Sequence, residues 1–224
     1  MKVSENALAN TVPSSHQVDK YVDIYENGGE KRVLFIGNSI TKHSPAPAIG
    51  WYGNWGMAAS CEENDYVHRT VAGLRKKFGE INFCVAQLAE WERRYSESEN
   101  VLKEYYTKAR DFTADIIIVR IGENINREEN KKNSCKPYFD AMIKFFTVKD
   151  NVKIIVTDNF WNIEALNKIF KEVSDENGYS FCHISDLEQD KRTMAKGLFE
   201  HEGVASHPGD YGMECIAKRI LERL

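Results

Sequence analysis

The stretch Val33-Leu34-Phe35-Ile36-Gly37-Asn38-Ser39-Ile40-Thr41 joins an unbroken apolar run to a glycine turn and a serine. The apolar run predicts a buried strand, and the turn places the Ser39 hydroxyl at the carboxyl end of that strand. Open α/β sheets bind their ligands along this edge. If a helix begins at the serine, its free backbone N–H groups can stabilise a negative oxygen. Serine is also a favoured helix cap, so this stretch alone leaves capping and catalysis open.

Strand-like and helix-like segments alternate along the rest of the chain. Five segments have strand patterns: 31–37, 81–88, 114–122, 151–158 and 179–185. Five segments have apolar residues at helical spacing: 65–79, 91–112, 135–146, 163–178 and 211–224. The unbroken run Ile116-Ile117-Ile118-Val119 predicts a strand that is buried on both faces, as in parallel sheets. We therefore expect an α/β fold, a three-layer α/β/α sandwich around a mostly parallel five-stranded sheet.

The length of 224 residues suits one large domain with a well-buried core. Residues 1–30 are polar and lack a strong period, so we expect an N-terminal arm that packs on a main domain formed by residues 31–224. No repeat or linker divides the chain.

Composition narrows the partners that the chain can have. The formal net charge of −4 gives no general attraction to nucleic acid or to anionic membranes. The N-terminus has no apolar core of signal-peptide length, which predicts a cytoplasmic protein unless a leader has been removed. The scattered cysteines contain no CxxC pair and are expected to be free thiols: Cys61, Cys84, Cys135, Cys182 and Cys215.

Three further segments could meet Ser39 at the sheet edge. Asn124 follows the third strand in Gly122-Glu123-Asn124, where its amide could donate hydrogen bonds or merely tolerate a turn. The segment 50–60 is rich in glycine and aromatic residues, which suits either an oxyanion donor or close packing of a loop. His207 lies in a loop before the last helix, and Asp210 is placed to cap that helix.

Together, these four segments resemble the SGNH (GDSL-like) hydrolases, from about Val33 to the C-terminus. The motifs Gly37-Asn38-Ser39-Ile40-Thr41 and His207-Pro208-Gly209-Asp210-Tyr211-Gly212-Met213 are the most specific part of the resemblance. It implies that Ser39 is the nucleophile and His207 the base. It also implies that the Ser39 N–H, the Asn124 side chain and a glycine N–H form an oxyanion hole. Gly56 is the preferred glycine and Gly53 the less favoured register.

The chain departs from the family pattern at two positions. The family often has aspartate where this chain has Asn38, a position that is not the nucleophile. The family usually has an aspartate three residues before the histidine, and here that residue is Val204. We therefore expect a Ser–His dyad, with Glu202 and Asp210 as weaker candidates for an acid that orients the histidine.

The resemblance implies a serine esterase that needs no metal and no organic cofactor. The expected substrate is a small-molecule or carbohydrate ester with a short acyl group such as acetate, and Asn38, Trp51, Trp55 and Glu123 are candidate substrate contacts. A catalytically impaired binding protein of the same fold is an alternative. A metal-dependent hydrolase that uses His201, Glu202, His207 and Asp210 is another, although their spacing fits no HExxH-type pair.

Overall fold

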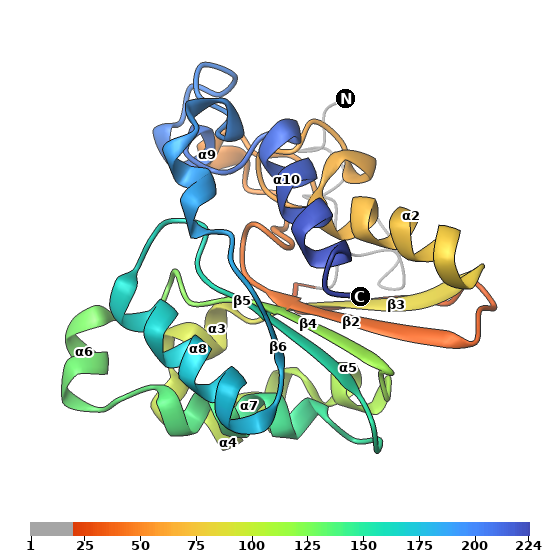
Figure 1. Cartoon of the computed structure of the whole chain (residues 1–224). Helices are drawn as coiled ribbons and strands as arrows, with labels where there is room; N and C mark the ends of the chain where they lie inside the picture. Colours follow the sequence, from red (N-terminus) through yellow and green to blue (C-terminus); the bar gives the residue numbers. More distant parts are fainter. Residues whose placement is uncertain (1–19) are drawn as a thin grey trace, which may run out of the picture.

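The computed structural model describes residues 20–224, which fold around one six-stranded sheet (Figure 1). The strands are β1 (Val22–Tyr25), β2 (Lys31–Gly37), β3 (Ile81–Gln87), β4 (Ile116–Arg120), β5 (Lys153–Thr157) and β6 (Ser180–Cys182). Their order across the sheet is β1-β3-β2-β4-β5-β6. All neighbouring strands pair in parallel except β1, which runs antiparallel to β3. The expected α/β/α architecture is confirmed.

Helices cover both faces of the sheet (Figure 1). On one face lie α2 (Tyr66–Phe78) and α10 (Asp210–Leu221), which pack in one core with the side chains of Val33, Phe35 and Ile118. On the other face, a second core contains Leu34, Ile36 and Ile117 from the strands and side chains from these helices: α3 (Ala89–Arg93), α4 (Ser98–Tyr105), α5 (Thr107–Asp111), α7 (Lys136–Phe146) and α8 (Glu164–Asn177). Adjacent strand residues thus point into opposite cores, as a strand buried on both faces requires.

The sheet has one strand more than the five expected from the sequence. All five predicted strands are present, and the sixth is β1, which lies within the predicted N-terminal arm. Its four residues pair with β3 at the edge of the sheet, from Val22 opposite Ala86 to Tyr25 opposite Phe83. Residues 22–25 of this segment therefore form part of the sheet. The prediction for residues 1–19 lies outside the described part of the chain.

The single helix expected over residues 91–112 is wrong. This segment forms the end of α3, a short 3₁₀ turn (Tyr95–Glu97), α4 and α5. The buried Tyr95 hydroxyl donates to the carbonyl of Asn133, whereas the Tyr106 hydroxyl donates to that of Gln87. The two tyrosines are thus bound to different segments of the fold, and these tertiary contacts override the helical periodicity of residues 91–112. The remaining α-helices of the described residues are α6 (Arg127–Lys132) and α9 (Glu202–Ala205), and short 3₁₀ helices cover Pro47–Ile49, Glu62–Asn64, Ser185–Gln189 and Lys191–Thr193.

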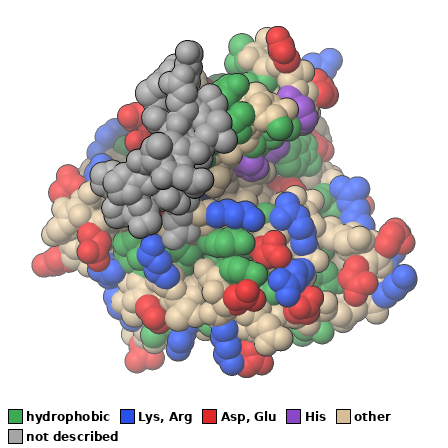
Figure 2. All heavy atoms as spheres, turned by 180° about the vertical axis from the view of Figure 1, so that it is seen from behind, with side chains coloured by type: hydrophobic (Ala, Val, Ile, Leu, Met, Phe, Trp, Pro, Cys, Tyr) green, Lys and Arg blue, Asp and Glu red, His purple; other side chains and the backbone are tan. Residues whose placement is uncertain are grey.

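Acidic and basic side chains are interspersed over the described surface that Figure 2 shows. Within residues 20–224, no helix combines the length and the apolar character that crossing a bilayer requires. All five cysteines are free thiols, as expected, and Cys84, Cys135 and Cys182 are buried.

Candidate active site

The structure brings Ser39 and His207 into direct contact although 168 residues separate them in sequence. The Ser39 Oγ lies 2.8 Å from the His207 Nε2, which is hydrogen-bonding distance. Ser39 follows the carboxyl end of β2, and His207 lies in the loop between α9 and α10. A hydroxyl in contact with an imidazole is the arrangement that activates a serine nucleophile.

Close packing at the end of β2 fixes the position of Ser39. A Cβ atom at Gly37 would lie 1.7 Å from the Thr41 Oγ1 and 2.8 Å from the Arg120 carbonyl oxygen, so only glycine fits there. The N–H groups of Thr41 and Lys42 both donate to the Asn38 carbonyl at 2.9 Å. The chain around the serine therefore forms a tight turn, and the helix considered from the sequence does not begin there.

A backbone carbonyl orients the imidazole of His207. The Nδ1 of His207 lies 2.7 Å from the Gly203 carbonyl oxygen. Because a carbonyl oxygen can only accept, the proton of the neutral ring is on Nδ1, and Nε2 is left as the acceptor that faces Ser39. The site therefore contains a Ser–His dyad whose tautomer is fixed by the main chain.

Neither carboxylate considered as an orienting acid contacts His207. Glu202 pairs with Lys196 on the surface. Asp210 accepts from the Ser60 N–H at 2.8 Å and the Ser60 hydroxyl at 2.7 Å. Neither of the two weaker candidates therefore orients the histidine in this structure, and the arrangement is that of the expected Ser–His dyad. Asp210 also does not cap α10, because it is the first residue of that helix and Gly209 is at the cap position.

Val204 occupies the position of the usual family aspartate, and its side chain is in an apolar cluster. It is fully buried in a small cluster that also contains Trp51, Met57, Ala58 and Ala195. A carboxylate there would lie among apolar groups without a partner. The apolar packing of the loop that carries His207 therefore explains why this position holds a valine and not an acid.

Burial lowers the pKa of His207 to about 4, although the Gly203 carbonyl favours the protonated ring. The positive charge of Arg120 lowers this pKa further. His207 is consequently neutral near pH 7, which is the state in which it can accept a proton from Ser39.

Gly56 has a packing role that differs from the one expected. Its N–H donates to the buried Asp65 carboxylate at 3.0 Å, so this donor is already used. A Cβ atom at Gly56 would lie 2.6 Å from the Ile40 carbonyl oxygen, which explains the glycine. The prediction of Gly56 as an oxyanion donor is therefore corrected. The alternative, Gly53, is buried against the rings of Trp51 and Trp55.

Asn124 is held by a buried carboxylate that the sequence did not reveal. The Asn124 Nδ2 donates to the Glu92 Oε2 at 2.5 Å. The other oxygen of Glu92 accepts from the Asn38 Nδ2 at 3.0 Å and from the Gly122 N–H at 2.6 Å. Glu92 is fully buried in α3 and thereby joins the residue before the serine to the loop after β4.

Asn38 and Glu123 are parts of this buried network rather than substrate contacts. Asn38 is fully buried, and its Nδ2 also donates to the Glu123 Oε2 at 2.6 Å. Arg120 forms a two-pronged ion pair with Glu123, at 2.7 and 2.9 Å, and also donates to the Asn38 Oδ1. Both prospective substrate contacts are thus occupied by neighbouring side chains, and that expectation is corrected.

Burial and the charges of the network together shift the pKa values of two carboxyl groups in opposite directions. Burial and the nearby Glu123 charge raise the pKa of Glu92, against the effect of its hydrogen bonds. Burial alone would also raise the pKa of Glu123, but the Arg120 charge and hydrogen bonds lower it. The Arg120 guanidinium thus stabilises the ionised carboxylate of Glu123 more than that of Glu92.

Trp51 and Trp55, the two tryptophans expected to contact substrate, are mainly part of the packing of the loops. Trp51 is 3% exposed, and its Nε1 donates to the His43 carbonyl at 3.0 Å. Trp55 is half-buried against it, with ring centroids 5.7 Å apart, and its Nε1 donates to the Ala59 carbonyl. Trp51 is therefore too buried to be the substrate contact expected from the sequence, which corrects that expectation.

A different tryptophan, Trp161, contacts His207. The Trp161 ring meets the His207 ring edge to face, with centroids 5.2 Å apart. Trp161 follows β5, so the rule that loops after parallel strands share one edge could have identified it from the sequence.

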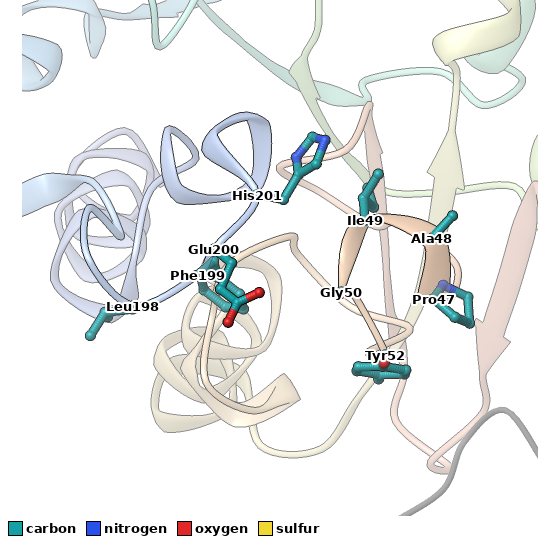
Figure 3. Close-up of a pocket in the computed structure, with 9 residues that line it drawn as sticks. All are labelled: Pro47, Ala48, Ile49, Gly50, Tyr52, Leu198, Phe199, Glu200 and His201. Atoms are coloured by element: carbon teal, nitrogen blue, oxygen red, sulfur yellow. The ribbon is translucent and has the colours of Figure 1, made fainter.

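A cavity of about 640 Å³ lies between two loops (Figure 3). One wall comes from residues 47–50 and Tyr52, and the other from residues 198–201. Tyr52, Glu200 and His201 supply its aromatic, acidic and imidazole side chains, and Tyr52 is 49% exposed. The second wall directly precedes the segment with Gly203 and His207.

The four residues considered as metal ligands do not converge. Among residues 20–224, no group of three or more His, Cys, Asp and Glu side chains is arranged to hold a metal ion. His201 lines the cavity, whereas Glu202, His207 and Asp210 contact separate partners.

Solved structures with the same fold include enzymes that act on esters. A two-domain esterase (CEX) active on acetylated mannans has a TM-score of 0.55 and 13% identity, with 86% of this chain covered but only 48% of the esterase. The alpha/beta hydrolase LAE5 from the metagenome of Lake Arreo has a TM-score of 0.53 and 17% identity, with 87% and 95% covered. A protein proposed to be a GDSL-like lipase from Parabacteroides merdae has a TM-score of 0.54 and 15% identity, with the same coverage.

No protein-family model and no curated protein sequence matches the chain. The structural comparisons support the expected SGNH-like fold, and at these identities they show the fold alone.

Proposed function

We propose that this chain, with the fold of GDSL-like esterases and lipases, is a serine hydrolase that cleaves carboxylic esters. The observation that carries the proposal is the 2.8 Å contact between the Ser39 Oγ and the His207 Nε2. The low pKa of His207 and its carbonyl-fixed tautomer support the role of base.

The proposed reaction is a two-step acyl transfer. The His207 Nε2 takes the proton of Ser39 while the Oγ attacks the ester carbonyl carbon. The resulting imidazolium then protonates the leaving alcohol, and an acyl-Ser39 remains. Water attacks the acyl group with His207 again as base, which releases the acid and restores the serine.

Two donors are proposed to stabilise the oxyanion, namely the Ser39 N–H and the Asn124 Nδ2. Asn124 has two N–H bonds on this nitrogen, and Glu92 accepts one of them. The second is proposed to donate to the substrate oxygen. Loss of one oxyanion donor typically lowers kcat by about 10²–10³-fold.

We propose short acyl esters, acetyl esters above all and those on carbohydrate in particular, as the substrate class. The cavity before the His207 segment has an exposed Tyr52 ring on one wall and the polar Glu200 and His201 on the other. An aromatic face opposite polar groups is suited to a sugar ring with its hydroxyls. One structural neighbour is described as active on acetylated mannans.

Hydrolysis of 4-nitrophenyl acetate by the parent and by S39A and H207A tests the proposal. We expect activity in the parent, loss of about 10³-fold or more in both variants, and no effect of a metal chelator. A parent without activity would favour the binding-protein alternative. Activity that survives S39A but is lost with chelator would favour the metal-dependent alternative.

A further inference from the structure

We propose that Glu92 is a positioning residue that fixes which end of the Asn124 amide faces the substrate. This inference rests on the proposed function, because it assigns how one of its oxyanion donors is oriented. Glu92 lies in α3, which follows β3, whereas Asn124 follows β4. Since β2 lies between these two strands, Glu92 reaches from one side of the serine-bearing strand to the other.

The hydrogen bonds of Glu92 show that its carboxylate acts only as an acceptor. Its Oε1 accepts from the Asn38 Nδ2, the Gly122 N–H and, at 3.3 Å, the Asn124 N–H. Its Oε2 accepts from the Asn124 Nδ2. Four donors thus converge on one buried carboxylate, and none of the contacts requires it to donate a proton.

An acceptor at this position selects one orientation of the Asn124 side chain. The two ends of an asparagine amide have nearly the same shape and differ only in hydrogen-bonding character. If the amide turned over, its Oδ1 would meet the Glu92 Oε2, and two acceptors would be buried in contact. That arrangement is costly, because a buried polar group without a partner loses its solvation without compensation. Glu92 therefore keeps the NH₂ group, with its second N–H bond, available for the oxyanion.

A glutamine at position 92 would reverse this selection with almost no change in size. Its oxygen can keep the contacts of Oε1, and its NH₂ would then replace Oε2. The Asn124 amide would turn over so that its oxygen accepts from this new donor. An acceptor would then stand where the oxyanion forms, and the transition state would be repelled rather than stabilised.

The experiment measures kcat and KM on an aryl acetate for the parent and for N124A, E92Q and the E92Q/N124A double variant. Active enzyme is counted by titration of Ser39. We expect kcat to fall about 10²-fold in N124A and at least as much in E92Q, with KM changed less than threefold. In the double variant, kcat should remain within about threefold of N124A, because Glu92 acts through Asn124. E90Q is the matched control on the same helix, since Glu90 pairs with Arg94 at the surface.

The rank order of two further variants separates orientation from packing. E92D and E92N have the same length, but aspartate has two acceptor oxygens, whereas in asparagine an NH₂ donor replaces one of them. We expect kcat of E92D to exceed that of E92N by about tenfold or more, and this comparison stands if E92Q does not fold. Equal kcat values for E92D and E92N, multiplicative losses in the double variant, or an E92Q with parental kcat would overturn the inference. A parent that neither hydrolyses the ester nor labels at Ser39 would instead refute the proposed function.

Discussion

Asn38 lies between two buried carboxylates, which makes the substitution N38D a sensitive test of the network beneath the serine. Its Nδ2 donates to Glu92 at 3.0 Å and to Glu123 at 2.6 Å. An aspartate, although frequent at this position in the resembled family, could not donate to both. The asparagine is therefore explained by the two glutamates that it bridges.

The contacts give the size of the expected effect. Each hydrogen bond to a charged group contributes about 1.5–3 kcal/mol, so loss of both would lower the unfolding free energy by about 3–6 kcal/mol at pH 7. Arg120 also donates to the Asn38 Oδ1 and would offset part of the repulsion. The predicted net loss is therefore in the lower half of that range, about 3–4 kcal/mol.

The loss should also depend on pH. Beside two carboxylates, the pKa of an aspartate at position 38 would lie above its unfolded value of about 3.9, so the folded state would bind more protons. Relative to the parent, the variant should therefore lose stability as pH rises from about 4 toward 7. When protonated, the new carboxyl can donate to one glutamate and restore one bond.

Urea unfolding at pH 5, 6 and 7 measures this difference directly. N126D is the matched control, because the Asn126 Oδ1 only accepts, from the N–H groups of Glu128 and Glu129 at 2.9 and 3.1 Å. We expect it to change stability by less than about 0.5 kcal/mol. An N38D protein within about 1 kcal/mol of the parent at pH 7, with no added pH dependence, would refute the reasoning.

Three further predictions concern His207 and its loop. In a pH profile of kcat/KM, the acidic limb should have a midpoint near 4, since His207 must be neutral to act as base and burial lowers its pKa to about 4; a midpoint near 6.5 would contradict this. V204D should lower the unfolding free energy by about 3 kcal/mol or more without raising kcat, because the new carboxylate would be buried among apolar groups while Gly203 still holds the imidazole; a gain in kcat would show that the acid can reach it. E202Q should keep kcat within about twofold, because Glu202 pairs with Lys196, and a loss of tenfold or more would assign it to the catalytic set.

The architecture was predictable because strand and helix periods in this chain agree with the tertiary structure. The runs that end at Gly37 and Arg120 are apolar enough to require burial on both faces, and they pair side by side in the sheet. β1 was missed because four residues with mixed burial give little periodic signal. The break in the segment 91–112 depends on tertiary hydrogen bonds that no local pattern encodes.

The sequence predicted the residues of the site that are defined by their own side-chain chemistry. It did not predict the features that depend on which neighbouring side chains they contact. Ser39 and His207 are brought together as expected. Whether the Gly56 N–H is available depends on Asp65, and nothing in a sequence tells which carboxylate will accept from it. Glu92 lies in a charged, helix-like segment where a glutamate normally faces solvent, so its burial could not be inferred from the pattern.

Mass analysis of the intact protein after fluorophosphonate treatment tests the central claim most directly. Because the Ser39 hydroxyl contacts a neutral imidazole, we predict a single adduct on the parent that maps to Ser39 and is absent from S39A. H207A should label at least about 10²-fold more slowly. A parent that stays unmodified, or an adduct that persists in S39A, would contradict the account.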